Sequence, residues 1–226
     1  MAEALFQLIS LLGLGFVLGL KHALDADHVA AISTIVSQTR SLRRSSLFGA
    51  FWGIGHTTTL LIIGFLILAL KLAIPDKVAL SFEFLVGIVL IVLGMDLLRK
   101  VVKDRVHLHQ HRHGKIIHAH LHSHETPSHA HSHKPFAVGM IHGLAGSASL
   151  MLLVLATVKS ILQGLLFILV FGVGSILSMM IISTVIGLPF IFSSRSTNVN
   201  DIVKVLAGAS STLLGFATIY GILTIA

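Results

Sequence analysis

Two imidazoles and two carboxylates fall within seven consecutive residues near the start of the chain, at His22, Asp25, Asp27 and His28. Long apolar stretches flank this segment on both sides. Inside a membrane, ionisable side chains are costly unless they are paired, and they usually serve a function. Imidazole and carboxylate groups together are ligands of divalent transition metals. The segment therefore predicts a metal site within a membrane span.

Helical geometry separates one of the four residues from the others. At about 100° per residue, an uninterrupted helix places His22, Asp25 and His28 on one face, whereas Asp27 points about 140° away from His22. Asp27 either supports the ligands or a neighbouring helix, or the helix unwinds so that Asp27 joins the ligands, as helices do at transport sites. A purely structural interpretation also stays open, in which the acids and imidazoles only pair with one another or lie at the membrane surface.

Two more histidines, His56 and His142, stand alone in later apolar stretches, and both are candidate ligands. A single histidine in such a stretch is often only a satisfied polar residue. The chain has no cysteine, which excludes thiolate ligands and disulfides. Imidazole with carboxylate suits Ni, Co, Cu or Zn better than Mg or Ca. Because imidazole must be deprotonated to bind a metal, loading is expected to weaken below about pH 6.5.

Eleven of the fifteen histidines lie between His107 and His133, many of them separated by one residue. This spacing lets several imidazoles reach one ion without a fixed fold, which predicts a metal reservoir. We expect most of residues 104–134 to be disordered without metal.

Composition places the chain in a lipid bilayer: 54% of its residues are hydrophobic, 11% are charged, and the mean hydropathy is +0.93. In a soluble protein a net charge of +7 would point to nucleic acid, but here the basic residues lie between apolar stretches and act as topology signals. We predict an all-α integral membrane protein with six transmembrane helices. The apolar stretches are residues 5–36, 47–70, 80–98, 136–158, 161–192 and 202–226.

Lysine and arginine are distributed unevenly over the predicted loops. Twelve lie in the loops on one side of the membrane, including the long loop between spans three and four, and only Lys71, Lys77 and Lys159 lie on the other. The positive-inside rule then predicts a cell-membrane protein with both termini outside and the histidine-rich loop in the cytoplasm.

Short motifs recur about 120 residues apart, which predicts a duplicated unit of three helices. An odd number of spans per unit inverts the second copy, a plan that puts the substrate site at mid-membrane between the halves. The expected organisation is three helices in residues 1–100, a histidine-rich cytoplasmic loop in 101–135, and three helices in 136–226. The matching segments are 19–24 with 139–144, 51–55 with 171–174, and 85–94 with 206–215.

Two carboxylates lie near the ends of the predicted third span. Asp96 is expected to pair with Arg99 or Lys100 and to be structural. Glu83, at the outer edge, either attracts cations or faces water, and the sequence does not decide between these roles.

The segment from His22 to His28, with four residues before Asp27-His28, resembles the signature of the nickel/cobalt transporter family. The Gly-His-Thr segment at His56 looks like that family's second motif, and residues 142–147 resemble a later segment of its shorter, urease-accessory-like members. The larger members have eight spans rather than six. A related efflux branch has about six spans and a histidine-rich loop but lacks the Asp-His pair.

This resemblance implies uptake of Ni²⁺ or Co²⁺, with His22, Asp27, His28 and His56 on the metal path. Efflux is the alternative direction, and a membrane metallochaperone that serves urease or hydrogenase maturation proteins is an alternative function. We expect no enzymatic activity, because no separate general base stands out, and no cofactor other than the transported ion. The sequence contains no nucleotide-binding motif.

Overall fold

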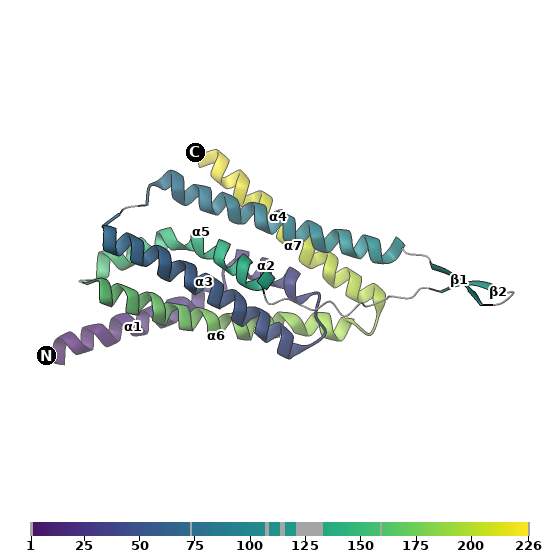
Figure 1. Ribbon diagram of the computed structural model, residues 1–226, viewed down its shortest axis with the longest axis horizontal. Coiled ribbons are helices and arrows are strands. Elements are labelled where there is room, and N and C mark those ends of the chain that lie inside the picture. Colours follow the sequence, from purple (N-terminus) through teal and green to yellow (C-terminus); the bar gives the residue numbers. More distant parts are fainter. Residues whose placement is uncertain are drawn as a thin grey trace.

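The computed structural model describes residues 2–72, 74–106, 109–113, 116–120, 133–158 and 160–225. These residues form helices, apart from one short β-hairpin (Figure 1). In lipid, backbone N–H and C=O groups need partners within the chain, and a helix supplies them. The elements are α1 (Ala2–His22), α2 (Ala26–Val36), α3 (Leu42–Leu70), α4 (Asp76–Val106), β1 (His109–His113), β2 (Ile116–His120), α5 (His133–Thr157), α6 (Ile161–Ser193) and α7 (Thr197–Ile225).

Five of the described helices, α1, α3, α4, α6 and α7, are long and apolar enough to cross a bilayer, which needs about 20 residues of helix. The predicted helical membrane fold is therefore confirmed. Helix α2, with 11 residues, is shorter than a span, and α5 coincides with the predicted fourth span but is not among the five. The count of six spans stays a prediction.

Several helices extend beyond the apolar stretches that predicted them. Helix α3 begins at Leu42 rather than at residue 47, and α4 covers Asp76–Val106 rather than 80–98. Charged residues end a hydropathy signal, but they do not end a helix, because helical hydrogen bonds join backbone atoms. Helix α6 also continues past Pro189 to Ser193.

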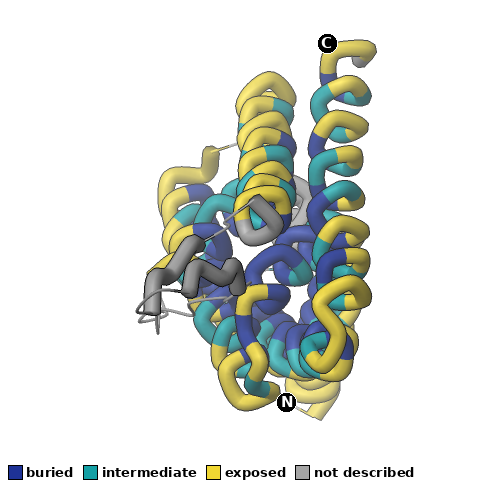
Figure 2. The backbone as a smooth tube through the Cα atoms, turned by 90° about the vertical axis from the view of Figure 1, so that its right-hand side faces the viewer, coloured by how far each residue is buried: buried dark blue, intermediate teal, exposed yellow. Residues whose placement is uncertain are grey.

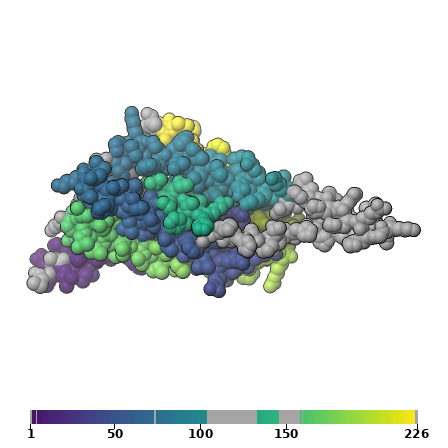
Figure 3. Space-filling model, in the orientation of Figure 1, coloured from purple at the N-terminus to yellow at the C-terminus, as the bar shows by residue number. Residues whose placement is uncertain are grey.

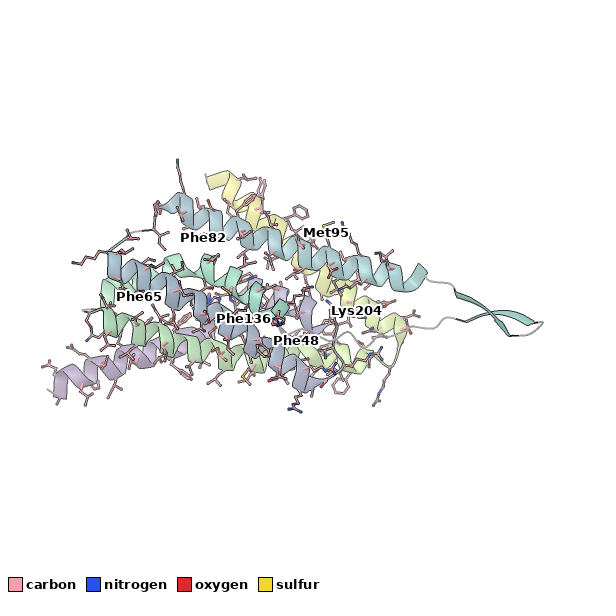
Figure 4. The ribbon with its side chains drawn as sticks, viewed as in Figure 1. Phe48, Phe65, Phe82, Met95, Phe136 and Lys204 are labelled. Atoms are coloured by element: carbon pink, nitrogen blue, oxygen red, sulfur yellow. The ribbon has the colours of Figure 1, made fainter. Side chains whose placement is uncertain are left out.

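The long helices enclose α2. Helix α3 packs against α5 and α6, α1 against α6, and α4 against α7, while α2 contacts α3, α4, α6 and α7. Most residues of α2 are buried, and the buried turns gather toward the inside of the bundle (Figure 2). Apolar side chains such as Phe65 and Met95 are exposed on the outside of the bundle (Figure 4). Helices α3, α4 and α5 form much of one face (Figure 3).

Glycines let these helices approach backbone to backbone. A Cβ atom added at Gly19 would collide with the carbonyl of Phe171 in α6, and one added at Gly139 would collide with the carbonyl of Trp52 in α3. Close backbone approach is how helices associate in lipid, where apolar side chains gain little by leaving their solvent. Other glycines whose added Cβ would stand within 3.0 Å of a carbonyl oxygen of a neighbouring helix are Gly49, Gly55, Gly94, Gly143, Gly174, Gly208 and Gly215.

We expect Gly19→Ala to lower the thermal unfolding midpoint of the purified protein, because the new methyl group would push α1 away from α6. Overpacking of this kind costs about 1–3 kcal/mol. Gly13, in the same helix, is the matched control, since an added Cβ there has no neighbour within 4 Å among the described residues. Equal unfolding midpoints for Gly19→Ala and Gly13→Ala would contradict the close packing of α1 on α6.

The connection between α4 and α5 is described only in part. Strands β1 and β2 pair antiparallel, with His109 opposite His120, so part of the predicted loop forms a hairpin. Residues 107–108, 114–115 and 121–132, which we expected to belong to a disordered loop, lie outside the described residues.

Asp96, in the second half of α4, pairs with Lys100 as predicted. Its carboxylate forms an ion pair with Lys100 at 2.9 Å, and Lys134 of α5 lies at 3.5 Å. Lys100 also donates a hydrogen bond to the side chain of Gln38 at 2.9 Å. All three charged groups are substantially exposed, so these pairs add little stability.

Candidate metal centre

The first predicted span is interrupted within the segment His22 to His28, which holds four of the predicted ligands. Helix α1 ends at His22, the next three residues form a turn, and α2 begins at Ala26. Asp25 is the N-cap residue of α2, a position that favours aspartate, but its side chain makes no capping hydrogen bond. It instead pairs with His22, with 2.7 Å between Oδ2 and Nδ1. The break thus directs both imidazoles of the segment inward.

Asp27 does not point away from the cluster, as it would on a continuous helix. Its Oδ1 accepts a hydrogen bond from the backbone N–H of His28 at 2.9 Å and lies 3.0 Å from Nδ1 of the same residue. A carboxylate accepts here, so Nδ1 of His28 is the donor, and Nε2 is the nitrogen of this ring that is available to a metal. Carboxylates that hold the remote nitrogen of a metal-binding histidine fix the ring and make it a stronger ligand. Asp27 therefore has the geometry of a residue that orients His28.

Four histidines from three parts of the chain meet in the interior. The ring centroid of His28 lies 4.7 Å from that of His22, 5.2 Å from that of His56 in α3, and 5.3 Å from that of His142 in α5. The His22 and His56 rings are 5.1 Å apart. The structure thus brings together all four predicted histidines, with Asp25 and Asp27 paired to two of them.

Several of these nitrogens lack the partner that burial requires. His28, His56 and His142 are at most 2% exposed. Nε2 of each, and Nδ1 of His56, find no hydrogen-bond partner among the described residues, whereas Nδ1 of His142 lies 3.2 Å from the carbonyl of Val138. Buried polar atoms are nearly always satisfied, so a cluster of unsatisfied imidazole nitrogens calls for a ligand.

A divalent transition-metal ion fits this donor set. One ligand atom from each of His22, His28 and His56 can be chosen so that all three lie within 4.8 Å of one another. Atoms of Asp25, Asp27 and His28 meet the same condition. Neutral imidazoles with nearby carboxylates suit Ni²⁺, Co²⁺, Cu²⁺ or Zn²⁺. Glu83, by contrast, is exposed on α4 and belongs to neither group.

Sequence reasoning missed the aromatic side chains that border the cluster. The indole of Trp52 lies 4.7 Å from the His142 ring, and the phenyl ring of Phe171 lies 5.5 Å from the His22 ring, measured between centroids. Apolar aromatics carry no signal of their own in a membrane sequence. The signal that could have found them is the similarity of segments 51–55 and 171–174, which contain these two residues.

Asp27→Asn is expected to weaken metal binding about 10- to 100-fold, the usual effect of removing a carboxylate that orients a ligand. The measurement is quenching by Ni²⁺ or Co²⁺ of the fluorescence of Trp52, the single tryptophan in the sequence. Its ring centroid is 6.1 Å from that of His28. Asp76→Asn, at an exposed position on α4, is the control. Equal affinities for the two variants would show that Asp27 does not support the site.

Comparison with known proteins places this bundle in a family. Residues 28–217 match the family described as the cytochrome c biogenesis protein transmembrane region. The chain is 43% identical to the urease accessory protein UreH of Bacillus sp. (strain TB-90), over 96% of this chain and 93% of that protein.

More distant relatives occur in plants. The chain is 28% and 29% identical to the chloroplast proteins FOR GROWTH AND FERTILITY 2 and 1 of Arabidopsis thaliana, over 73% of this chain and 44% and 46% of theirs. No solved structure matches. The long match to UreH and the family match agree with the membrane helices described above. The chain therefore belongs to the family described as the cytochrome c biogenesis protein transmembrane region, and it is a relative of the urease accessory protein UreH.

Proposed function

We propose that this protein transports Ni²⁺ or Co²⁺ across the cell membrane, in the direction of uptake, through the cluster of His22, His28, His56 and His142. The observation that carries the proposal is the set of buried imidazole nitrogens without partners among the described residues. A membrane protein with no metal to bind would gain by replacing these groups with apolar ones. The name of the relative UreH fits nickel, since urease is a nickel enzyme.

The proposed architecture is an inverted repeat of three helices plus three. Helix contacts across the interior support it. For each contact, adding about 120 to the lower residue number and subtracting about 120 from the higher one gives a second contact that is also present. The Gly19–Phe171 contact corresponds to Gly139–Trp52, and the helix pair α1–α6 corresponds to α5–α3. Further matching contacts are Gly55–Phe136 with Gly174–Phe16, Gly53–Ile176 with Gly172–Thr57, and Gly87–Gly215 with Gly208–Gly94.

The proposed topology has both termini outside and the histidine-rich segment in the cytoplasm. The distribution of Lys and Arg supports this orientation. In Figure 1 both termini lie toward one end of the bundle, and the β1–β2 hairpin projects from the other. Ions bound by the hairpin would then be ions that have crossed, which is the arrangement expected for uptake into a buffered cytoplasm.

The Asp27-His28 pair favours uptake over efflux, because it matches the signature of the uptake proteins and orients a buried ligand here. We assign the chain to the shorter, urease-accessory-like branch of the nickel/cobalt transporters on the same ground. The rival function is a membrane metallochaperone, which would receive nickel and deliver it to maturation proteins without moving it across the bilayer.

Deleting residues 107–133 separates these functions. We expect the deletion to leave the initial rate of Ni²⁺ flux into proteoliposomes within about twofold, because the cluster of unsatisfied imidazoles lies elsewhere, in the helical bundle. Nickel retained by the protein should fall at the same time. The assay compares Ni²⁺, Co²⁺ and Zn²⁺, with and without a proton gradient. Loss of all flux on deletion, or an absence of flux in the intact protein, would contradict transport.

A further inference from the structure

Two buried hydroxyl groups near the cluster differ from those elsewhere in the helices. The hydroxyls of Thr58, Ser183 and Thr184 donate to the carbonyl four residues earlier, the usual solution for serine and threonine inside a helix. The hydroxyls of Thr57 and Ser175 find no partner among the described residues, although these residues are only 8% and 1% exposed. These two hydroxyls therefore do not form the usual hydrogen bond to the carbonyl four residues earlier, and their oxygen atoms remain available to a ligand.

Thr57 of α3 lies against Gly172 of α6, and the backbone of Ser175 in α6 lies against Gly19 of α1, one turn before His22. A Cβ atom added at Gly172 of α6 would stand 2.7 Å from Oγ1 of Thr57, and Ser175 follows Gly172 by one helical turn. Thr57 in turn follows His56 directly. The two hydroxyls therefore belong to the same part of the interior as the imidazole cluster.

The internal repeat relates Ser175 to His56. Adding 119 or 120 residues takes His22 to His142, Trp52 to Phe171 and His56 to Ser175. The contacts obey this relation: the His22 ring faces Phe171 at 5.5 Å, and the His142 ring faces Trp52 at 4.7 Å. The His22 and His56 rings are 5.1 Å apart, and the repeat relation assigns Ser175 the corresponding position next to His142.

We propose that Nε2 of His142 and the hydroxyl oxygens of Ser175 and Thr57 form a second position for the transported ion, next to the position at His22, His28 and His56. This inference rests on the proposed transport function and adds a step to it. One imidazole and two neutral oxygens bind a divalent transition metal more weakly than several imidazoles supported by carboxylates. An ion must be held weakly enough to leave, and a weaker neighbouring position provides that step.

The first test compares equilibrium binding with flux in Ser175→Ala. We expect its nickel affinity, measured by Trp52 fluorescence, to stay within about twofold of the unaltered protein, while the flux into proteoliposomes falls about tenfold. Ser183→Ala is the matched control, because Ser183 is buried in the same helix but donates to the Met179 carbonyl. Unchanged flux in Ser175→Ala, or an equal loss in Ser183→Ala, would overturn the second position.

The second test uses the absence of cysteine from the sequence. Ser175→Cys provides a single thiol, which we expect to react with a small methanethiosulfonate reagent and to be protected by Ni²⁺ about fivefold or more. Ser183→Cys should stay unreactive. A Ser175→Cys thiol that is inert, or that reacts equally fast with and without Ni²⁺, would overturn the proposal. If the transport function itself is wrong, the unaltered protein will show no nickel flux, which is a different outcome.

Discussion

His28→Gln will lower metal-dependent flux at least about a hundredfold, the largest loss we expect from any single substitution in the cluster. The His28 ring is the only one within 5.3 Å of the other three clustered histidine rings among the described residues. Its Nδ1 atom also lies 3.0 Å from Oδ1 of Asp27. Removing it deprives the ion of its central ligand and leaves Asp27 without a ring to orient. Initial rates of nickel and cobalt entry into proteoliposomes measure the effect.

Glutamine is chosen because it retains polar atoms in a buried position and avoids a large cavity. The control for folding is the thermal unfolding midpoint without metal, which should stay close to that of the unaltered protein. If His28→Gln folds normally and still transports nickel at more than about a tenth of the original rate, the ion does not pass through this cluster.

His56→Leu will have opposite effects on stability and function. Neither ring nitrogen of His56 has a partner among the described residues, and the side chain is fully buried. Leaving such groups unsatisfied costs about 1–3 kcal/mol, and leucine fills a similar volume without them. We therefore expect the metal-free variant to unfold at a higher temperature than the unaltered protein. Flux should nevertheless fall, although by less than in His28→Gln, because a ligand is missing.

Added metal separates this explanation from a general packing effect. A ligand that binds only the folded state raises the unfolding midpoint, so Ni²⁺ should stabilise the unaltered protein and leave His56→Leu unchanged. A variant that is still stabilised by nickel, or that unfolds much earlier without it, would show that His56 is a packing residue.

Sequence patterns pointed to the membrane helices and to an unusual first span, because ionisable residues inside an apolar stretch are costly in lipid. A continuous helix could not place Asp27 on the same face as His22, Asp25 and His28. The sequence therefore left three interpretations: Asp27 supports the ligands or a neighbouring helix, the helix breaks so that Asp27 joins them, or the four residues only pair with one another. The break occurs at Ala23–Asp25. His56 and His142 were candidate ligands on sequence grounds, although a single histidine in an apolar stretch is often only a satisfied polar residue, and the structure places both rings next to that of His28.

Other features depend on packing that a sequence does not display. The boundaries of α3 and α4 differ from the apolar stretches because helices continue into water. The position of Asp27 follows from the turn before α2, whose geometry a continuous-helix projection cannot represent. Ser175 is one serine among many in the sequence, and it stands out in the folded chain because its buried hydroxyl finds no partner among the described residues.

Nickel X-ray absorption of the chain lacking residues 107–133 is the most direct test of the metal centre. The deletion leaves only four histidines, at positions 22, 28, 56 and 142, so imidazole scattering must come from them. We predict at least three imidazole ligands per bound nickel, with one fewer in His28→Gln. A nickel ion surrounded only by oxygen atoms, or a spectrum that is identical in His28→Gln, would contradict a histidine site in the middle of the bundle.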